Sequence, residues 1–219
     1  FALNLADNMA GNSLLVSLEM SPEQLTAKRV SRLTGYASSK LLSGQLPDKA
    51  WEAVAMATTV IDQSGVYFNS RYDLTVQEIH LLAQSVPQLR CVFLDYLGLI
   101  RPASRNGSAY EQVSQISREL KRMAISLNVP VVCLCQLSRK IEERKERKPV
   151  LSDLRDSGAI EQDADGVLFL YREDYYTGTS ADGFPSDVTL TVAKNRHGKT
   201  GEDSFRFWLE SSTFQECAL

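Results

Sequence analysis

The stretch Cys91-Val-Phe-Leu-Asp-Tyr-Leu-Gly-Leu-Ile100 places one carboxylate, Asp95, at the end of an apolar run. The run predicts a buried strand that ends at this residue. A carboxylate in such surroundings is costly to bury unless it is hydrogen-bonded, paired with a cation or bound to a metal. Two interpretations stay open at this point: a strand that ends in a polar turn, or a carboxylate that holds Mg²⁺.

Around this stretch, expected strands alternate with expected helices over the first two thirds of the chain. Strands are expected at 13–17, 66–69, 91–95, 129–136, 166–171, 188–193 and 204–209. Capping boxes mark the start of three helices, at Ser21 with Gln24, Thr75 with Glu78 and Ser108 with Glu111. This order predicts an α/β fold with a mostly parallel central sheet flanked by helices. The last two strands, separated by a turn at 197–201, predict an antiparallel C-terminal hairpin.

Composition sets broad limits on the protein. The 219 residues are 43% hydrophobic and 23% charged, which is enough for one α/β domain with a substantial core. The formal net charge of -3 argues against a protein that is basic all over, although a local basic path could still bind a polyanion. The mixed segment 139–148 carries six basic and three acidic residues and is predicted to be a solvated loop.

Cysteine and histidine usage offers no metal cluster, and no segment points to a membrane. The cysteines at 91, 133, 135 and 217 are interpreted as reduced core residues, and His80 and His197 lack the spacing of metal ligands. No apolar run reaches the roughly 18 residues that cross a bilayer, and the first residues do not have the pattern of a signal peptide. We therefore expect a protein of the reducing cytoplasm.

Polar side chains stand at the ends of four expected strands. They are Glu19, Asp95, Gln136, and Lys194 with Arg196. In open parallel sheets, ligands bind at the carboxyl ends of the strands. The coincidence of four such ends predicts a ligand site at that edge of the sheet.

Five motifs follow one another along nearly the whole chain. They are Ser17-Leu-Glu-Met20, Asp95-Tyr-Leu-Gly-Leu99, Pro130-Val-Val with Gln136-Leu-Ser-Arg139, Ser152-Asp-Leu-Arg-Asp-Ser-Gly-Ala-Ile-Glu-Gln-Asp-Ala-Asp165, and Lys194-Asn-Arg-His-Gly198. In this order they resemble the RecA-type motor domain of the DnaB-like replicative helicases, which are hexameric ring helicases. The block from 152 to 165 is the most specific of the five because of its length.

The resemblance implies a RecA-like P-loop NTPase core that binds ATP and Mg²⁺. It makes Glu19 the general base for the attacking water, Asp95 the Walker B carboxylate that acts on Mg²⁺ mostly through water, and Gln136 the sensor of the γ-phosphate. The alternative for Glu19 is an exposed residue before a helix. For Gln136 it is a hydrogen bond at the end of a strand.

The resemblance also implies contacts with a neighbouring subunit and with DNA. Lys194 and Arg196 lie two residues apart on an expected strand, so both point to one face; in the family this pair reaches a neighbour's nucleotide, with Arg196 as the arginine finger. Arg155, Asp156 and Gly158 match the loop that holds phosphates of single-stranded DNA. The alternatives are a solvent-exposed pair for the first group, and a capped helix start with Arg155 paired to an acid for the second.

Further expectations concern the whole assembly. The resemblance implies a homo-oligomer, a hexameric ring, with primase and a helicase loader as partners of the intact protein. We expect residues 1–219 to form a single motor domain that begins just after the Gly-Lys-Ser/Thr phosphate loop and lacks the N-terminal collar domain, so that ATP binding by this chain is weak. Two other functions stay open: a RecA- or KaiC-like ring or filament ATPase without unwinding, and a non-catalytic DNA-binding scaffold.

Overall fold

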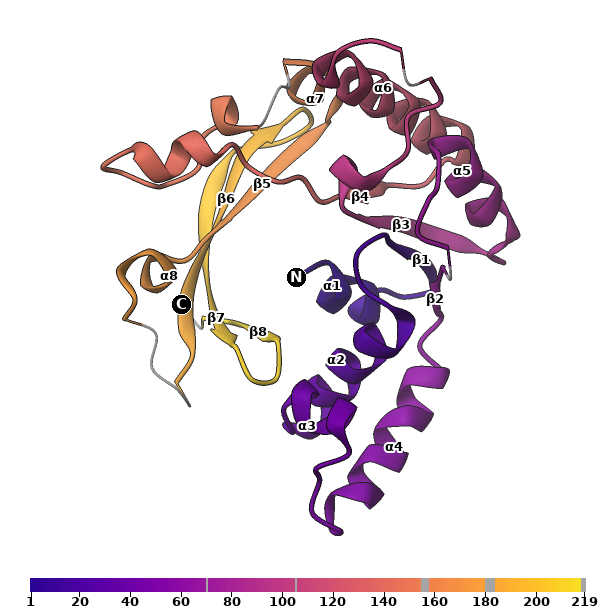
Figure 1. The fold of residues 1–219 in the computed structure, drawn as a ribbon, viewed down its shortest axis with the longest axis vertical. Coiled ribbons are helices and arrows are strands. Elements are labelled where there is room, and N and C mark those ends of the chain that lie inside the picture. Colours follow the sequence, from indigo (N-terminus) through magenta and orange to yellow (C-terminus); the bar gives the residue numbers. More distant parts are fainter. Residues whose placement is uncertain (70, 105, 155–157, 180–183, 218–219) are drawn as a thin grey trace.

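A four-stranded parallel sheet forms the centre of the molecule (Figure 1). The computed structural model describes residues 1–69, 71–104, 106–154, 158–179 and 184–217. In spatial order, the strands are β2 (Val66–Phe68), β1 (Asn12–Ser17), β3 (Leu89–Asp95) and β4 (Val131–Cys133). Each pair of neighbours runs parallel, as the alternation of strands and helices predicted.

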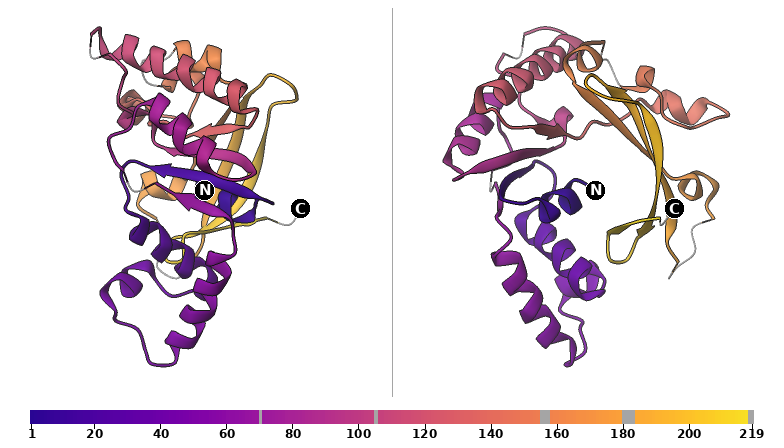
Figure 2. Two further views of the ribbon diagram at one scale, coloured as in Figure 1. Left: turned by 90° about the vertical axis from the view of Figure 1, so that its right-hand side faces the viewer. Right: turned by 180° about the vertical axis from the view of Figure 1, so that it is seen from behind.

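Helices cover both faces of this sheet (Figures 1 and 2). One face packs against α5 (Val76–Ser85) and α6 (Ala109–Leu127), and the other against α1 (Ala2–Asn8) and α2 (Pro22–Thr34). In β1, Leu14 and Val16 join the core on the α5 and α6 side, whereas Leu15 joins Phe93 on the α1 side. Successive side chains of a strand point to opposite faces of the sheet. Because both faces are buried, every position of β1 and β3 favours an apolar residue, and the sequence of each strand is a nearly continuous apolar run.

The helix starts follow the sequence signals closely. All three predicted capping boxes are present, and α2 ends at Gly35, which has a φ of 78°. The remaining helices are α3 (Ser38–Ser43), α4 (Ala50–Asp62), α7 (Gly158–Asp163) and α8 (Glu173–Thr177), with 3₁₀ turns at Leu97–Leu99, Arg139–Glu143 and Leu151–Asp153. Neither α3 nor α4 begins with a side-chain cap, and neither was marked by a capping box in the sequence.

A second sheet, entirely antiparallel, contains the C-terminal strands. Its order is β5 (Gly166–Tyr171), β6 (Ser186–Asn195), β7 (Gly201–Trp208) and β8 (Thr213–Glu216). The predicted hairpin is present as β6 and β7, but it pairs with β5 and β8 and does not extend the parallel sheet. Val167 and Phe169 of β5 still pack into the core beneath α5 and α6, which joins the two sheets into one body.

Two segments differ from their predictions. The expected buried strand over 129–136 is shorter and only partly buried, because β4 is the edge strand of the parallel sheet. Segment 139–148, predicted to be a solvated loop, is anchored at two points: Arg144 pairs with Asp153 at 2.6 Å, and Lys148 pairs with Glu202 of β7 at 2.9 Å.

The described helices include none that is both long and apolar enough to cross a membrane.

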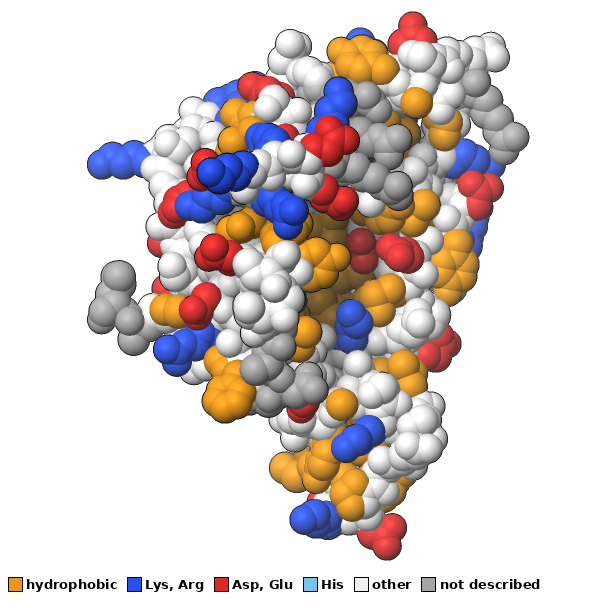
Figure 3. Space-filling model, turned by 60° about the vertical axis from the view of Figure 1, so that its left-hand side comes forward, with side chains coloured by type: hydrophobic (Ala, Val, Ile, Leu, Met, Phe, Trp, Pro, Cys, Tyr) orange, Lys and Arg blue, Asp and Glu red, His pale blue; other side chains and the backbone are white. Residues whose placement is uncertain are grey.

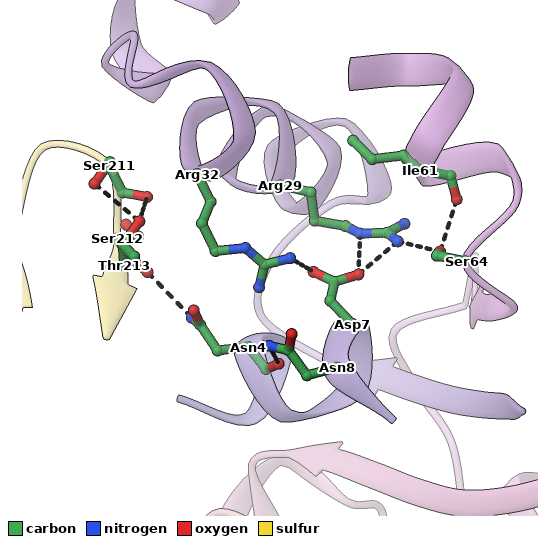
Figure 4. A network of polar contacts seen from close by, with 10 residues as sticks. All are labelled: Asn4, Asp7, Asn8, Arg29, Arg32, Ile61, Ser64, Ser211, Ser212 and Thr213. Carbon is green, nitrogen blue, oxygen red and sulfur yellow. Dashed lines mark hydrogen bonds and ion pairs between the residues drawn. The ribbon is translucent and has the colours of Figure 1, made fainter. Parts of the chain in front are cut away.

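Polar contacts fix α1 between α2 and the turn after β7 (Figure 4). The Asp7 carboxylate accepts hydrogen bonds from Arg29 Nε at 2.7 Å and from Arg32 Nη2 at 2.5 Å. Only 4% of the Asp7 side chain and 2% of the Arg29 side chain are exposed. On the other side of α1, Asn4 Nδ2 donates to the carbonyl of Ser212 at 3.1 Å. The position of α1 against the sheet therefore depends on a buried ionic cluster.

Candidate active site

Glu19 and Asp95 lie at the ends of adjacent strands, at the carboxyl edge of the parallel sheet: Asp95 is the last residue of β3, and Glu19 follows β1 by two residues. The register pairs Ser17 of β1 with Asp95 of β3, so the two strands end level. The backbone N–H of Leu18 donates to the carbonyl of Asp95 at 2.8 Å, which ties the turn before Glu19 to β3. Ser17 Oγ accepts the N–H of Met20 at 3.0 Å and fixes the other side of this turn. The peptide bond between Asp95 and Tyr96 is cis.

The electrostatics of this edge favour a bound cation. Burial raises the pKa of Asp95, and the negative charge of Glu19 raises it further, while the positive charge of Lys28 lowers it. The described residues contain no cluster of three or more His, Cys, Asp or Glu side chains that could hold a metal. A metal here would have two carboxylates at most and would take its other ligands from water or phosphate. This donor set suits Mg²⁺, which keeps several waters and binds few protein carboxylates.

Gln136 lies beyond the end of β4 and is exposed. Leu134 N–H donates to the carbonyl of Leu94 at 2.9 Å, so the segment before Gln136 is joined to β3. After it, Leu137 forms an antiparallel bridge with Leu154, and Ser138 N–H donates to the carbonyl of Asp153 at 2.8 Å. Continuous backbone hydrogen bonding therefore connects the strand that carries Asp95 with the block that begins at Ser152.

Lys194 lies in β6 and Arg196 directly follows this strand, and both side chains contact the C-terminal end of α7. Lys194 Nζ donates to the carbonyls of Glu161 at 2.5 Å and Ala164 at 2.7 Å. Arg196 Nη1 donates to Asp165 Oδ1 at 2.9 Å. The structure thus forms two groups of site residues: Glu19 with Asp95 at the sheet edge, and Lys194 with Arg196 against the C-terminal end of α7.

Of the predicted DNA contacts, only Gly158 falls among the described residues. It is exposed and begins α7. Arg155 and Asp156 lie outside the described residues. Figure 3 shows one face of the molecule hollowed in its middle, with apolar side chains in the hollow and charged side chains of both signs around it.

Two further residues belong to these groups and were missed from the sequence. Lys28 of α2 acts electrostatically on Asp95, and Asp165 pairs with Arg196. Nothing in the sequence marked Lys28 as a site residue, because a lysine on a charged helix surface is common. Asp165 closes the specific block 152–165, so its place in the motif could have marked it.

A family model, the DnaB-like helicase C terminal domain, matches residues 1–216. The chain belongs to this family. The replicative DNA helicase DnaC of Bacillus subtilis (strain 168) is 37% identical over 98% of the chain and 48% of the relative's length. The replicative DNA helicase DnaB of Geobacillus stearothermophilus is also 37% identical, with the same coverage. The chain therefore spans about half the length of the curated relatives it matches.

Solved structures support the same assignment. A DnaB-like replicative helicase, described with its interactions with primase, aligns with a TM-score of 0.92 and 35% identity over 99% of this chain and 54% of its own. A second solved structure, described as an ATPase domain, aligns with a TM-score of 0.89 and 35% identity, over 99% of this chain and 78% of its own. RadB recombinase, at 15% identity and a TM-score of 0.57, shares the fold. The expected fold class, a RecA-like α/β core, is confirmed.

Proposed function

We propose that this chain is the motor domain of a replicative DNA helicase, which hydrolyses ATP at subunit interfaces and moves along single-stranded DNA. The observation that carries the proposal is the level pair of strand ends that brings Glu19 and Asp95 to one edge of the sheet. Phosphoryl transfer requires positioned charges more than covalent catalysis, and two carboxylates at a strand edge meet that requirement. Family membership and the identity to replicative helicases support it independently.

Each carboxylate has its own task in this proposal. Asp95 holds Mg²⁺, mostly through water, and Glu19 accepts a proton from the water that attacks the γ-phosphate. A bound Mg²⁺ supplies positive charge to the phosphate oxygens. Gln136 senses the γ-phosphate, and its backbone connection to 153–154 provides a route toward Arg155 and the DNA loop.

The proposal places a Gly-Lys-Ser/Thr phosphate loop directly before Phe1. The packing of α1 against Leu15 of β1 and Phe93 of β3 supports this, because it puts α1 beside the two strands that lead to Glu19 and Asp95. Backbone amides and a lysine at that position would face the phosphates of ATP.

Lys194 and Arg196 act on the nucleotide of a neighbouring subunit. Arg196 has a 45% exposed side chain, so its guanidinium is accessible to another protein surface. A permanently charged, planar guanidinium suits the charge that develops on the γ-phosphate. This function requires a homo-oligomer, which we propose is a hexameric ring.

DNA and protein partners complete the proposal. Arg155, Asp156 and Gly158 hold successive phosphates of single-stranded DNA in the central channel, without reading sequence. Primase and a helicase loader bind the intact protein, in keeping with the primase interactions described for one structural neighbour. The protein acts in the cytoplasm of a bacterium or a phage-infected cell.

Two measurements on the full-length protein, with the residues that precede Phe1, test this function. We expect single-stranded DNA to stimulate ATP hydrolysis, and Glu19→Ala or Arg196→Ala to abolish it while circular dichroism stays unchanged. Retained turnover in either variant would remove that residue from the mechanism. A strand-displacement assay on a forked duplex then separates a helicase from a RecA- or KaiC-like ATPase, since only a helicase releases the strand. If the full-length protein did not bind ATP, the result would favour the alternative function, a non-catalytic DNA-binding scaffold.

A further inference from the structure

Asp165 lies between two cationic side chains. Its Oδ1 accepts Arg196 Nη1 at 2.9 Å, and its Oδ2 accepts Lys121 Nζ at 2.5 Å. Arg196 is also held through its backbone, because its N–H donates to the carbonyl of Asp165 at 2.7 Å. One short segment therefore fixes both the main chain and the side chain of the proposed finger residue.

The end of α7 adds three carbonyl acceptors to the same contact. Arg196 Nη2 donates to the carbonyl of Gln162 at 3.0 Å, and Lys194 Nζ donates to those of Glu161 and Ala164. An ammonium group has three N–H donors and a guanidinium has five, so each side chain is oriented by two hydrogen bonds and keeps donors free. The geometry therefore fixes the direction of both cations and leaves them able to bind phosphate.

We propose that Asp165, together with the C-terminal end of α7, is a positioning residue that aims Arg196 and Lys194 at the nucleotide of the neighbouring subunit. This inference rests on the proposed function, since it requires the finger to act between subunits. Gln162 follows Gly158, a proposed DNA contact, by about one turn of the same helix. A displacement of α7 by DNA would therefore move both cations together.

The exposure of the pair argues against a purely structural role. The side chains of Arg196 and Asp165 are 45% and 48% exposed, and ion pairs of that exposure contribute little to stability. Hydrogen bonding from Lys121 lowers the pKa of Asp165, and the charge of Arg196 lowers it further, so the carboxylate is charged at neutral pH. Such a contact orients a side chain more than it stabilises a fold.

The first test measures DNA-stimulated ATP hydrolysis by the Asp165→Asn variant of the full-length protein. We expect kcat to fall about 10- to 100-fold with the KM for ATP unchanged, because misplacing a catalytic group by about 1 Å lowers the rate by about that factor. Loss of the whole arginine finger lowers the rate by about 10³-fold or more. Glu202→Gln is the matched control: Glu202 lies in β7, is also 48% exposed and pairs with Lys148. Asp165→Ser is measured alongside, so that the result does not depend on how one variant folds.

The second test assembles rings from mixtures of two variants. A folding defect and a defect in positioning the finger across the subunit interface change the ATPase activity of such rings differently. If Asp165 acts through Arg196, Asp165→Asn subunits keep a complete catalytic edge of their own. Mixing them with Glu19→Ala subunits, whose fingers are intact, should restore hydrolysis, and mixing them with Arg196→Ala subunits should not. Turnover of Asp165→Asn within about two-fold of the unmodified protein, or rescue by Arg196→Ala, would overturn the inference. An unmodified protein without ATPase activity would instead contradict the proposed function.

Discussion

Removal of the Asp7 carboxylate is expected to destabilise the chain strongly. In Asp7→Ala, the guanidinium groups of Arg29 and Arg32 lose the anion that both contact at about 2.5 Å, and their side chains are only 2% and 14% exposed. Breaking a buried pair by removing one partner costs about 3–5 kcal/mol, because an uncompensated charge stays buried. For a domain of this size, each kcal/mol lowers Tm by about 2–4 °C, so the expected loss is about 6–20 °C.

Urea unfolding, followed by far-UV circular dichroism, measures this free energy directly. Asp165→Ala is a matched control, since Asp165 also pairs with two cations, Lys121 and Arg196, but its side chain is 48% exposed. The control should lose no more than about 1 kcal/mol. If Asp7→Ala costs less than about 1 kcal/mol, or no more than the control, the Asp7 cluster does not fix α1 and the reasoning from burial is refuted.

Three other predictions concern individual elements. Ser108→Ala removes the cap of α6 and should lower the unfolding free energy by about 1 kcal/mol in the same urea assay. Leu120→Ala, at a side chain only 6% exposed, should cost about 2–5 kcal/mol, whereas Leu81→Ala, at 62% exposure, should cost little; equal losses would contradict the assigned core. Asp95→Asn should raise the urea midpoint at pH 7, because folding raises the pKa of Asp95 and the charged form therefore destabilises the native state. That gain should vanish as the pH falls through the folded-state pKa; a gain that persists at low pH would contradict this cause.

Local signals predicted much of the fold because they depend on neighbours in the sequence. The capping box at Ser108 and Glu111 is present, and the apolar stripe of α6 is buried at Ile116, Leu120 and Met123. A helix start needs only a few adjacent residues to satisfy its free N–H groups. The continuous apolar run ending at Asp95 likewise predicted a strand covered on both faces.

Long-range pairing was less accessible to sequence reasoning. The hairpin of β6 and β7 was expected, but its place in a separate antiparallel sheet depends on pairing between β5 and β6, which alternation alone does not encode. Segment 139–148 was predicted to be solvated because it mixes basic and acidic residues, whereas the ion pair of Lys148 with Glu202 spans 54 positions. The contact of Asp165 with Arg196 was missed for the same reason, since the two residues are 31 positions apart.

In the proposed function, each ATP site is completed by a neighbouring subunit, with Glu19 on one side of the interface and Arg196 on the other. Mixing inactive Glu19→Ala and Arg196→Ala subunits of the full-length protein tests it most directly, with DNA-stimulated ATP hydrolysis as the readout. In randomly mixed rings about a quarter of the interfaces combine an intact Glu19 with an intact Arg196, so hydrolysis should return to as much as about a quarter of the unmodified rate. Mixed rings that stay as inactive as either variant alone would contradict the claim.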